Sequence, residues 1–575
     1  MAEYLSPGVY VEEFDSGSVP MANVSTSTAG FVGVTEKGPH EGVPVLVTNY
    51  ANFRRIFGGN LSENEFGEYR YLSYAVSQFF TNGGSRCYIK RVVPSDAAFA
   101  HSVEDDISAP LTIYAKNPGA WGNKITITIN PSSKAKTQIL ERIETSNDVK
   151  FRVKNASGFS AGDIIAFDDR SSKRYNKITS VDGNMLTFAE VFDESVVDTG
   201  LIPAKVISSC EVDIEVKYEN QVERFDSCSF NMDSSDFINQ KLAKSEIVIA
   251  DAKTTDEIIA PFKLISGNDE GEFIISLFGG TNGTLDALSA ADFVGEDNGP
   301  GERTGIQAFI DNNEVSIMAV PGVTDPQVQL TLVAHCELMT NRFAILDVPR
   351  EKKTVDDVLS HRNFFDSEFA AMYHPWIKVL DPLTKNTTAI PPSGSVAGIY
   401  ARTDNSRGVH KAPANEIVSA CVGLDCNYTT GEQDILNPKG VNLIRSFTGQ
   451  GIRIWGARTV SSNALWRYVN VRRLFIFIEE SIRRSTNWVV FEPNDQLLWL
   501  RVRRTIEIFL GDVWRTGALA GTTEDEAFFV DIGPNTMTQG DIDAGRLICV
   551  IGVAPTKPAE FVIFRITQKT SGGGE

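Results

Sequence analysis

The sequence predicts an α+β protein of several domains. We expect an α/β domain that is interrupted by a β-rich inserted domain, followed by an α+β domain in the C-terminal third. Strand–helix–strand patterns occur on both sides of a long stretch of short alternating strands, and two amphipathic helices dominate the last third. The chain of 575 residues is also too long for a single hydrophobic core.

Residues 1–28 predict a strand followed by a linker. Val9 and Val11 lie on one side of the expected strand, and Tyr10 and Phe14 lie on the other. Residues 15–28 are mostly small and polar and have no apolar pattern, which is typical of a linker. The strand has no neighbour in sequence, so it needs a partner elsewhere in the fold or in another chain.

Residues 29–110 and 279–400 predict the two parts of one α/β domain. In the second part, a strand at 314–320, a helix at 327–339 and a strand at 342–349 follow one another. This pattern is a βαβ unit, and we expect its strands to be parallel and its crossover right-handed.

Residues 111–278 predict the inserted β-rich domain. Short alternating runs such as KITITIN at 124–130 and EVDIEVKYE at 211–219 are separated by turn signals. Residues 148–207 are candidates for a small barrel within this domain. No sequence motif assigns the inserted domain a role.

Residues 401–552 predict the C-terminal domain, with helices at 462–484 and 496–514. Asn494 and Asp495 are candidate caps of the second helix. On both helices, Arg residues lie eleven positions apart, which places them on one face away from the apolar stripe. The candidate contact residues on these faces are Arg472, Arg473, Arg483, Arg484, Arg501, Arg504 and Arg515.

Residues 553–575 predict a second linker and strand at the other end of the chain. The linker contains Pro, and the run FVIFRIT at 561–567 favours a strand. Its apolar residues are Phe561, Ile563, Phe564 and Ile566. Both ends of the chain are therefore expected to carry a strand on a linker.

The net charge of −20 argues against nucleic acid as a partner. Residues 440–520 differ from the rest, with twelve Arg, no Lys and six acidic residues. Such an Arg block favours specific pairing with carboxylates, and internal ion pairs are the simpler explanation for some of it. No apolar stretch approaches the length that spans a membrane, so we expect no membrane insertion.

The sequence favours a protein without catalytic or metal sites and without cofactors. Seven scattered Cys indicate reduced thiols in a cytoplasm, and Cys421 and Cys426 alone make a poor zinc site. An alternative, a hydrolase-like enzyme, would use Asp325, or Asp347 with Arg350, at the carboxyl ends of the parallel strands. No nucleophile or phosphate-binding motif supports it.

Motifs along the chain resemble one known family, the contractile tail sheath proteins of phages and of phage-tail-like injection systems. They include YLSPGVYVEE, TAGFVGVTEKGP, FGGTNG and RFAILDVP. The resemblance is densest from PWIKVLDP onwards, through RGVHKAPAN, YVNVRRLFIFIEESI and VAPTKPAEFVIFRI.

The resemblance implies a structural protein that polymerises as stacked hexameric rings around an inner tube. The sheath contracts and drives the tube through a target envelope. The two terminal arms complete a sheet in the C-terminal domain of neighbouring subunits, and the linker at 15–28 is expected to carry the motion. The C-terminal domain faces the tube, and the Arg-bearing face of 462–484 is slightly favoured for that contact.

The resemblance also implies the partners and the location of the protein. The partners are other copies of the chain, the inner tube protein, and baseplate and cap proteins. Assembly in a bacterial cytoplasm, as part of a phage virion tail or a tail-like particle, is implied as well. A cap or baseplate subunit of the same machine is an alternative, although two terminal strands favour the repeating sheath.

Overall fold

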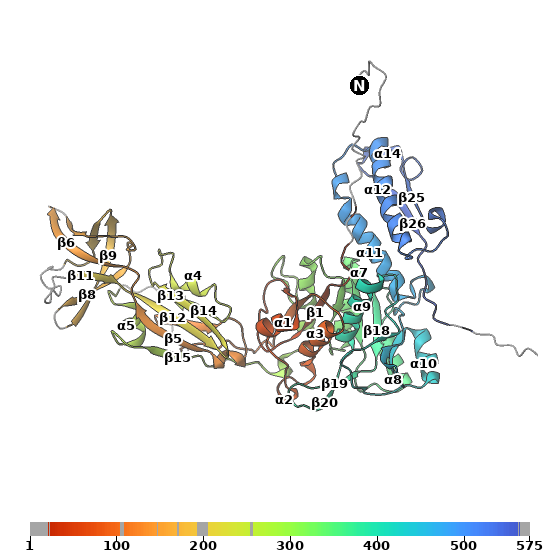
Figure 1. Ribbon diagram of the computed structural model, residues 1–575, viewed down its shortest axis with the longest axis horizontal. Helices are drawn as coiled ribbons and strands as arrows, with labels where there is room; N and C mark the ends of the chain where they lie inside the picture. Colours follow the sequence, from red (N-terminus) through yellow and green to blue (C-terminus); the bar gives the residue numbers. More distant parts are fainter. Residues whose placement is uncertain are drawn as a thin grey trace, which may run out of the picture.

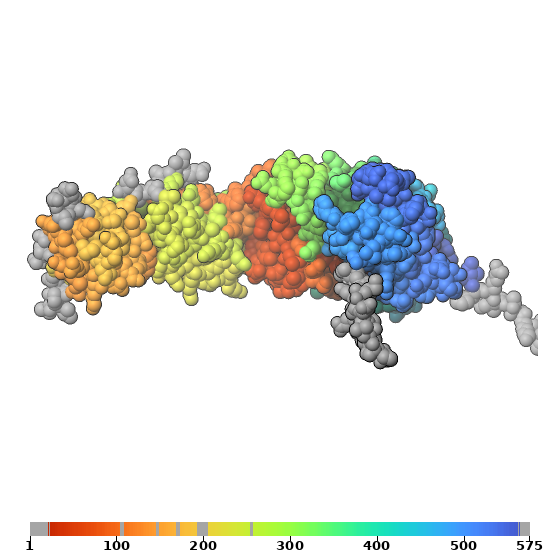
Figure 2. Space-filling view, turned by 90° about the horizontal axis from the view of Figure 1, so that it is seen from above, coloured from red at the N-terminus to blue at the C-terminus, as the bar shows by residue number. Residues whose placement is uncertain are grey.

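The protein has the shape of a long row of domains with one domain raised at the end (Figures 1 and 2). The computed structural model describes residues 21, 24–103, 109–145, 148–169, 172–191, 205–253, 257–561 and 563. The arm residues Val9, Tyr10, Val11, Phe14, Phe564 and Ile566 lie outside this range.

A nine-stranded, mostly parallel sheet forms the centre of the molecule, in the order β2-β3-β1-β16-β17-β18-β23-β24-β21. The pairs from β3 to β23 are parallel, and β2, β24 and β21 add antiparallel edges. Between β3 and β16 the chain leaves this sheet. The strands are β1 (Ala29–Val34), β2 (Val45–Val47), β3 (Cys87–Val92), β16 (Ile317–Ala319), β17 (Phe343–Asp347), β18 (Ala370–His374), β21 (Glu416–Ile417), β23 (Val441–Phe447) and β24 (Gly451–Ile454).

Helices cover both faces of the nine-stranded sheet because its strands are apolar on both sides. In β1, Phe31 packs into one core with α1, α3 and α9, and Val32 packs into the opposite core with α6, α7, α8 and α10. The βαβ unit is present as predicted, since β16 and β17 are parallel neighbours joined by α7. The helices are α1 (Tyr50–Phe57), α2 (Glu63–Phe66), α3 (Tyr71–Thr81), α6 (Ala290–Val294), α7 (Pro326–Met339), α8 (Val355–Arg362), α9 (Ser393–Arg407) and α10 (Thr430–Leu436).

A three-stranded sheet, in the order β20-β19-β22, lies beside the central sheet. Its members are β19 (Ile377–Leu380), β20 (Thr387–Ile390) and β22 (Gly423–Leu424). Ile377, Val379 and Ile390 bury their side chains in the same core as α3 and α9. This small sheet therefore extends the central unit and is not a separate domain.

The chain between β3 and β16 forms a β-rich region with its own core. A four-stranded sheet, in the order β13-β12-β5-β15, and the pair β14-β4 enclose Ile127, Ile214 and Val248. The alternation seen in the sequence buries every second residue of β12 against this core. The elements are β4 (Leu111–Ala115), β5 (Thr126–Ser132), β12 (Glu211–Tyr218), β13 (Gln221–Cys228), α4 (Ile238–Leu242), β14 (Val248–Ala252), α5 (Pro261–Ser266) and β15 (Phe273–Ser276).

A closed barrel lies at the far end of the row (Figure 1). Its strand order is β10-β7-β6-β11-β8-β9, and it encloses a small apolar core that includes Phe151, Ile165 and Ile178. The barrel begins at β6, earlier than the expected 148–207. The strands are β6 (Lys136–Thr145), β7 (Asp148–Val153), β8 (Ile164–Asp169), β9 (Ser172–Asp182), β10 (Met185–Phe188) and β11 (Val206–Ser209).

The C-terminal domain stands at the opposite end of the molecule from the barrel (Figure 1). Its two long helices pack against a two-stranded antiparallel sheet of β25 and β26 through a separate apolar core. Asp495 caps α12 as expected, by accepting a hydrogen bond of 2.8 Å from the amide of Leu498. The elements are α11 (Val469–Ser485), α12 (Gln496–Arg515), α13 (Glu524–Ala527), β25 (Phe528–Ile532), α14 (Gln539–Asp543) and β26 (Cys549–Val553).

Two expectations about the C-terminal third are wrong. The expected domain boundary at 400/401 falls inside the buried helix α9, and β23 and β24 belong to the central sheet. The first long helix begins at Val469 and not at 462, and Leu465, within the expected span, is 69% exposed. Among the described residues, no helix has both the length and the apolar composition needed to cross a bilayer.

Helices α3 and α9 approach each other closely because two glycines of α9 lie at the crossing. A Cβ on Gly394 would lie 2.4 Å from the carbonyl oxygen of Ala75, and one on Gly398 would lie 2.4 Å from that of Phe79. Backbone atoms cannot move aside as a flexible side chain can. The close packing of α3 on α9 therefore requires glycine at both positions.

We predict that Gly394→Ala destabilises the protein by about 1–3 kcal/mol through overpacking. Hydrogen exchange of peptides from α3 and α9 should accelerate in this variant. Gly431→Ala is the matched control, since a Cβ at this position of α10 meets nothing within 4 Å. The control should leave exchange unchanged or slower, and equal behaviour of the two variants would contradict the packing argument.

Candidate interaction sites

The root of the N-terminal arm is held by a buried ion pair between α9 and α11. Arg473 of α11 donates two hydrogen bonds, of 2.9 and 2.6 Å, to the carboxylate of Asp404 in α9. The Thr26 hydroxyl donates to the same carboxylate at 2.7 Å, and Arg473 donates to the Thr26 carbonyl at 2.8 Å. Both charged side chains are at most 5% exposed, so one pair joins the arm root to both helices.

Further contacts complete this junction. The guanidinium of Arg473 lies over the ring of Tyr400, and the Tyr400 hydroxyl hydrogen-bonds that of Tyr373 at 2.7 Å. The amide of Val24 donates to the Ser481 hydroxyl of α11. The chain is therefore fixed to the body from Val24 onwards, and the expected moving linker at 15–28 cannot move independently over 24–28.

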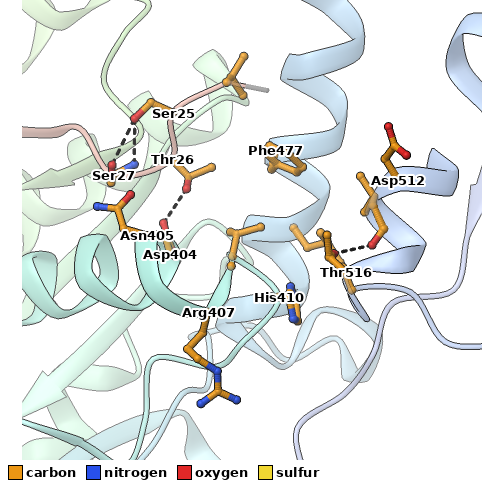
Figure 3. A pocket seen from close by; sticks show the side chains of 16 residues that line it. Ser25, Thr26, Ser27, Asp404, Asn405, Arg407, His410, Phe477, Asp512 and Thr516 are labelled. Carbon is orange, nitrogen blue, oxygen red and sulfur yellow. Dashed lines mark hydrogen bonds between the residues drawn. The ribbon is translucent and has the colours of Figure 1, made fainter. Parts of the chain in front are cut away.

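A cleft of about 410 Å³ lies beside the arm root, between α9, α11 and α12 (Figure 3). Ser25, Asp404, His410, Phe477 and Thr516 are among its lining residues. Burial, followed by the charge of Arg407, lowers the pKa of His410, so this ring is neutral near pH 7. The Thr26 hydroxyl donates to the Asp404 carboxylate, which Arg473 already binds, so this pair fits a contact region better than a reaction site.

Arg472 and Arg473 do not face outwards, so their assignment as tube contacts is wrong. Arg472 is 6% exposed and pairs with Glu368 and Glu479, and its guanidinium lies over the ring of Trp466. Arg473 forms the ion pair with Asp404 described above. Helical periodicity placed these residues opposite an apolar stripe, but carboxylates of the same subunit occupy that side of α11.

Arg483 and Arg484 lie at the end of α11 and share one acidic partner. Both donate hydrogen bonds to the carboxylate of Glu480. Burial of this carboxylate raises its pKa, but the hydrogen bonds from the two guanidinium groups outweigh burial and hold the pKa below its ordinary value. Glu479 pairs with Arg472 instead, and Arg484 also donates to the Asn313 carbonyl. These two Arg residues are thus partly satisfied within the subunit.

Arg501 and Arg504 are the candidates that remain free. Both are exposed on α12, and neither side chain has an ion pair or hydrogen bond with another described residue. Arg515, on the same helix, is exposed but pairs with Asp512 and Glu524. The exposed residues Leu497, Leu500 and Ile508 lie three or four positions from these Arg residues along α12, on the same face of the helix. We call this surface, made of Leu497, Leu500, Arg501, Arg504 and Ile508, the outer face of α12.

The acids at the strand ends have structural partners within the fold. Asp325 caps α7 by accepting a hydrogen bond from the amide of Gln327. Asp347 is 2% exposed and accepts hydrogen bonds from the Gly322 amide and from the amide and hydroxyl of Ser393. Burial raises the pKa of Asp347 to about 6.

The remaining candidate polar groups are also engaged within the fold. Arg350 pairs with Asp425 and lies over the ring of Trp376. The Cys421 thiol contacts the Gly423 carbonyl, and the Cys426 thiol lies 3.8 Å from His374. Across the residues that the structure covers, no group of His, Cys, Asp and Glu is arranged to hold a metal ion.

The fold and these sites define a class of protein: an elongated multidomain chain whose candidate sites, the N-terminal arm root and the outer face of α12, suit protein–protein contacts. Two family models match consecutive parts of the chain, "Phage tail sheath protein central domain" over residues 298–460 and "Phage tail sheath C-terminal domain" over residues 461–569. Their boundary at 460/461 agrees with the central sheet, which ends at β24.

Known tail sheath proteins are similar in sequence over about half of the chain. A "putative prophage major tail sheath protein" of Pseudomonas aeruginosa is 25% identical over 288 residues, which cover 48% of this chain and 72% of the relative. The tail sheath protein of Escherichia phage P2 is 24% identical over 297 residues, which cover 49% and 72% of the two chains.

Solved structures share the fold along almost the whole length. The PVC sheath of an extracellular contractile injection system, solved in the contracted state, has a TM-score of 0.52 at 22% identity and covers 99% of both chains. The helical sheath of the anti-feeding prophage, also contracted, has a TM-score of 0.51 at 21% identity, with 98% of this chain and all of that chain covered.

Residues 298–569 thus match the domain models of phage tail sheath proteins. The resemblance to contractile tail sheath proteins read from the sequence is confirmed by the two family models and the curated relatives. The protein is a structural sheath subunit and not an enzyme, and the hydrolase alternative falls with that assignment.

Sequence reasoning did not find the junction that holds the N-terminal arm root. Thr26 stood in an unpatterned linker, and no motif singled out Asp404 near the start of the expected C-terminal domain. The partners are separated by 378 and 69 residues, so no local spacing connects them. The Arg enrichment of 440–520 was the available signal, but it does not indicate which Arg is buried.

We predict that Asp404→Ala destabilises the subunit by about 3–5 kcal/mol, because it leaves the buried guanidinium of Arg473 without its counter-ion. Arg515→Ala is the control, since both members of its pair with Asp512 are more than 60% exposed. Loss of an exposed pair should cost less than about 1 kcal/mol. Chemical denaturation of both variants measures the difference, and equal stabilities would contradict the assigned role of the junction.

Proposed function

We propose that the chain polymerises with copies of itself as stacked hexameric rings around an inner tube, and that contraction of this sheath drives the tube through a target envelope. The match to the tail sheath domain models supports this proposal. One structural observation carries its central step. Within the described residues, the sheet of the C-terminal domain has two strands, β25 and β26.

A two-stranded sheet leaves a row of unpaired backbone groups on each of its two edges. Such a pair is only marginally stable alone, and added strands would satisfy its edges. The two terminal arms are the available donors. The apolar side chains of Phe561 and Ile563 are 74% and 81% exposed in the single subunit, as expected for an arm that is buried only after it pairs with a neighbouring subunit. Val9, Tyr10, Val11 and Phe14, together with Phe564 and Ile566, are the other proposed pairing residues.

The long axis of the molecule supports an orientation within the sheath. The barrel and the C-terminal domain lie at opposite ends (Figure 1), so one end can face the tube while the other faces outwards. We assign the C-terminal domain to the tube, since both arm roots and the outer face of α12 belong to this end. The β-rich region at 111–278 then lies on the outside.

The outer face of α12 is our candidate for tube contact, in preference to α11. Arg501 and Arg504 have no partners among the described residues, whereas the Arg residues of α11 are buried or already paired. A complementary tube surface would carry carboxylates beside apolar residues. Exposed charge pairs are individually weak, about 0.2–1 kcal/mol each, so such a contact is strong only in sum and releases without unfolding a core.

The remaining partners follow from the same assembly. The anti-feeding prophage structures of similar fold are described as a helical sheath and as a baseplate. We propose baseplate and cap proteins as end partners of the polymer, and assembly in a bacterial cytoplasm as part of a phage tail or tail-like particle. The cap-or-baseplate alternative predicts a closed ring and no long tubes.

We predict that deletion of residues 1–14 gives a subunit that folds but does not polymerise. The deletion removes the proposed donor strand and leaves the described body, including the junction at Thr26, intact. Thermal unfolding should match that of the full chain within a few degrees, while electron microscopy should show no tubes. Normal tubes from the truncated chain would overturn the strand-donation proposal.

We predict that Arg501→Glu combined with Arg504→Glu prevents assembly on the tube and spares the fold. Placing like charges across a contact costs several kcal/mol, and repetition along the tube multiplies the loss. Co-sedimentation with purified tubes, at low and high salt, measures this effect. Lys217→Glu combined with Lys244→Glu, at two exposed positions of the inserted region, is the charge-matched control. Equal binding by both variants would contradict the contact.

A further inference from the structure

The C-terminal linker is attached to two different parts of the subunit before the arm begins. The carbonyl of Ala554 accepts a hydrogen bond from Ala520, and the amide of Thr556 donates to Ala518, both within the C-terminal domain. Four residues later, Glu560 binds Arg458, which follows β24 of the central sheet. Residues 554–560 therefore form a strap between the C-terminal domain and the central unit.

We propose that Arg458, Asn437 and Tyr468 form a carboxylate-binding socket that fixes Glu560, and that this socket is the mechanical anchor of the C-terminal arm. The proposal rests on the strand-donating function proposed above for that arm. When a neighbouring subunit pulls on the arm, the socket passes the force to the nine-stranded central sheet. Strand β26 and its two-stranded sheet are then not loaded.

The socket satisfies both oxygens of the Glu560 carboxylate. Arg458 donates from Nε to Oε1 at 2.9 Å and from Nη2 to Oε2 at 2.6 Å, in a bidentate pair. Asn437 Nδ2 donates to Oε1 at 2.7 Å, and the Tyr468 hydroxyl donates to Oε2 at 3.1 Å. The side chains of Arg458 and Glu560 are 8% and 20% exposed, so the pair is largely shielded from salt.

The socket is itself held rigidly by the central sheet. The backbone amide of Arg458 donates to the side chain of Asn442, whose amide group donates back to the Arg458 carbonyl, both at 2.7 Å. Asn442 lies in β23, is fully buried, and also donates to the Met372 carbonyl of β18. A chain of direct hydrogen bonds therefore leads from Glu560 to two central strands.

The strap contains Pro555 and Pro558, which fix φ and limit its conformations. A short segment stiffened in this way cannot lengthen to absorb a displacement. Motion of the arm is then confined to the residues beyond Glu560. At the other end of the chain, the junction of Thr26, Asp404 and Arg473 plays the corresponding part, with Arg473 again binding a carboxylate.

The protonation of Glu560 gives the socket a defined pH range. Burial raises the pKa of this carboxylate, but the hydrogen bonds from Arg458 and Asn437, with the charge of Arg458, outweigh burial and hold the pKa below its ordinary value of 4.5. No charged group other than Arg458 contacts the carboxylate among the described residues. The stabilisation is therefore complete above pH 4.5 and is lost as the pH falls through the lowered value.

Glu560→Gln tests the proposal, because it keeps the shape of the side chain and removes its charge. Hydrogen exchange of the peptide covering 554–561 in the free subunit should accelerate at least about tenfold, while peptides from the central sheet stay unchanged. Polymerised sheaths of this variant should fall apart at lower guanidinium concentration than wild type. Arg458→Lys should have an intermediate effect, since lysine cannot form the bidentate pair.

Asp525→Asn is the matched control, because this exposed carboxylate has no hydrogen bond or ion pair with another described residue. Unchanged exchange at 554–561 in Glu560→Gln would overturn the socket. Faster exchange with wild-type sheath resistance would overturn its role as the anchor. A separate experiment tests strand donation by the C-terminal arm. If a chain truncated after residue 561 still forms normal sheaths, the arm does not donate a strand, whatever the result for the socket.

Discussion

The buried pairing of Arg473 with Asp404 is the interaction on which the arrangement of the parts depends. It joins α11 of the C-terminal domain to α9 of the central unit, and Thr26 adds the N-terminal arm root to the same pair. Taking two charges out of water is costly, and only bidentate geometry with further hydrogen bonds recovers that cost. An apolar contact here would tolerate sliding, whereas the fixed directions of these hydrogen bonds define one relative position.

The same chemistry recurs where the C-terminal arm leaves the body, at Arg458 and Glu560. Arginine suits both places because its planar donor groups match a carboxylate and because it stays charged in a low-dielectric site. The enrichment of Arg over Lys in 440–520 thus has an internal explanation for several residues. Because several of these Arg residues pair within the subunit, the net positive charge of residues 440–520 does not by itself indicate an acidic partner surface.

The sequence predicted the elements better than it predicted their neighbours. Strong local patterns, such as the βαβ unit of β16, α7 and β17, were read correctly because their periodicity and their turns are local. The start of the barrel and the boundary at 400/401 were misplaced. Strand β6 pairs with β11, which lies about 70 residues further along the chain, so no local pattern links the two strands. Helix α9 is buried on most sides and therefore lacks the one-sided apolar stripe that would mark it in the sequence.

The arginines of α11 show the same limit at the level of a site. A helical pattern identifies which residues share a face, but it does not state what covers that face. Arg472 and Arg473 met carboxylates from Glu368 and Asp404, which lie far away in sequence. Arg501 and Arg504 have the same local signature, and their side chains have no partner among the described residues. Only the tertiary arrangement separates the structural arginines from the free ones.

A sheath that contracts needs two kinds of contact with opposite properties. The contacts between subunits must persist through a large rearrangement, whereas the contact between the sheath and the tube must dissociate. Backbone pairing of a donated strand suits the first, because many cooperative hydrogen bonds must break together. Exposed arginines beside a few apolar side chains suit the second, because each contact is weak and accessible to water. On the proposed assignment this subunit keeps the two kinds apart: the strand arms extend from buried carboxylate anchors, and the releasable contact occupies the solvent side of α12.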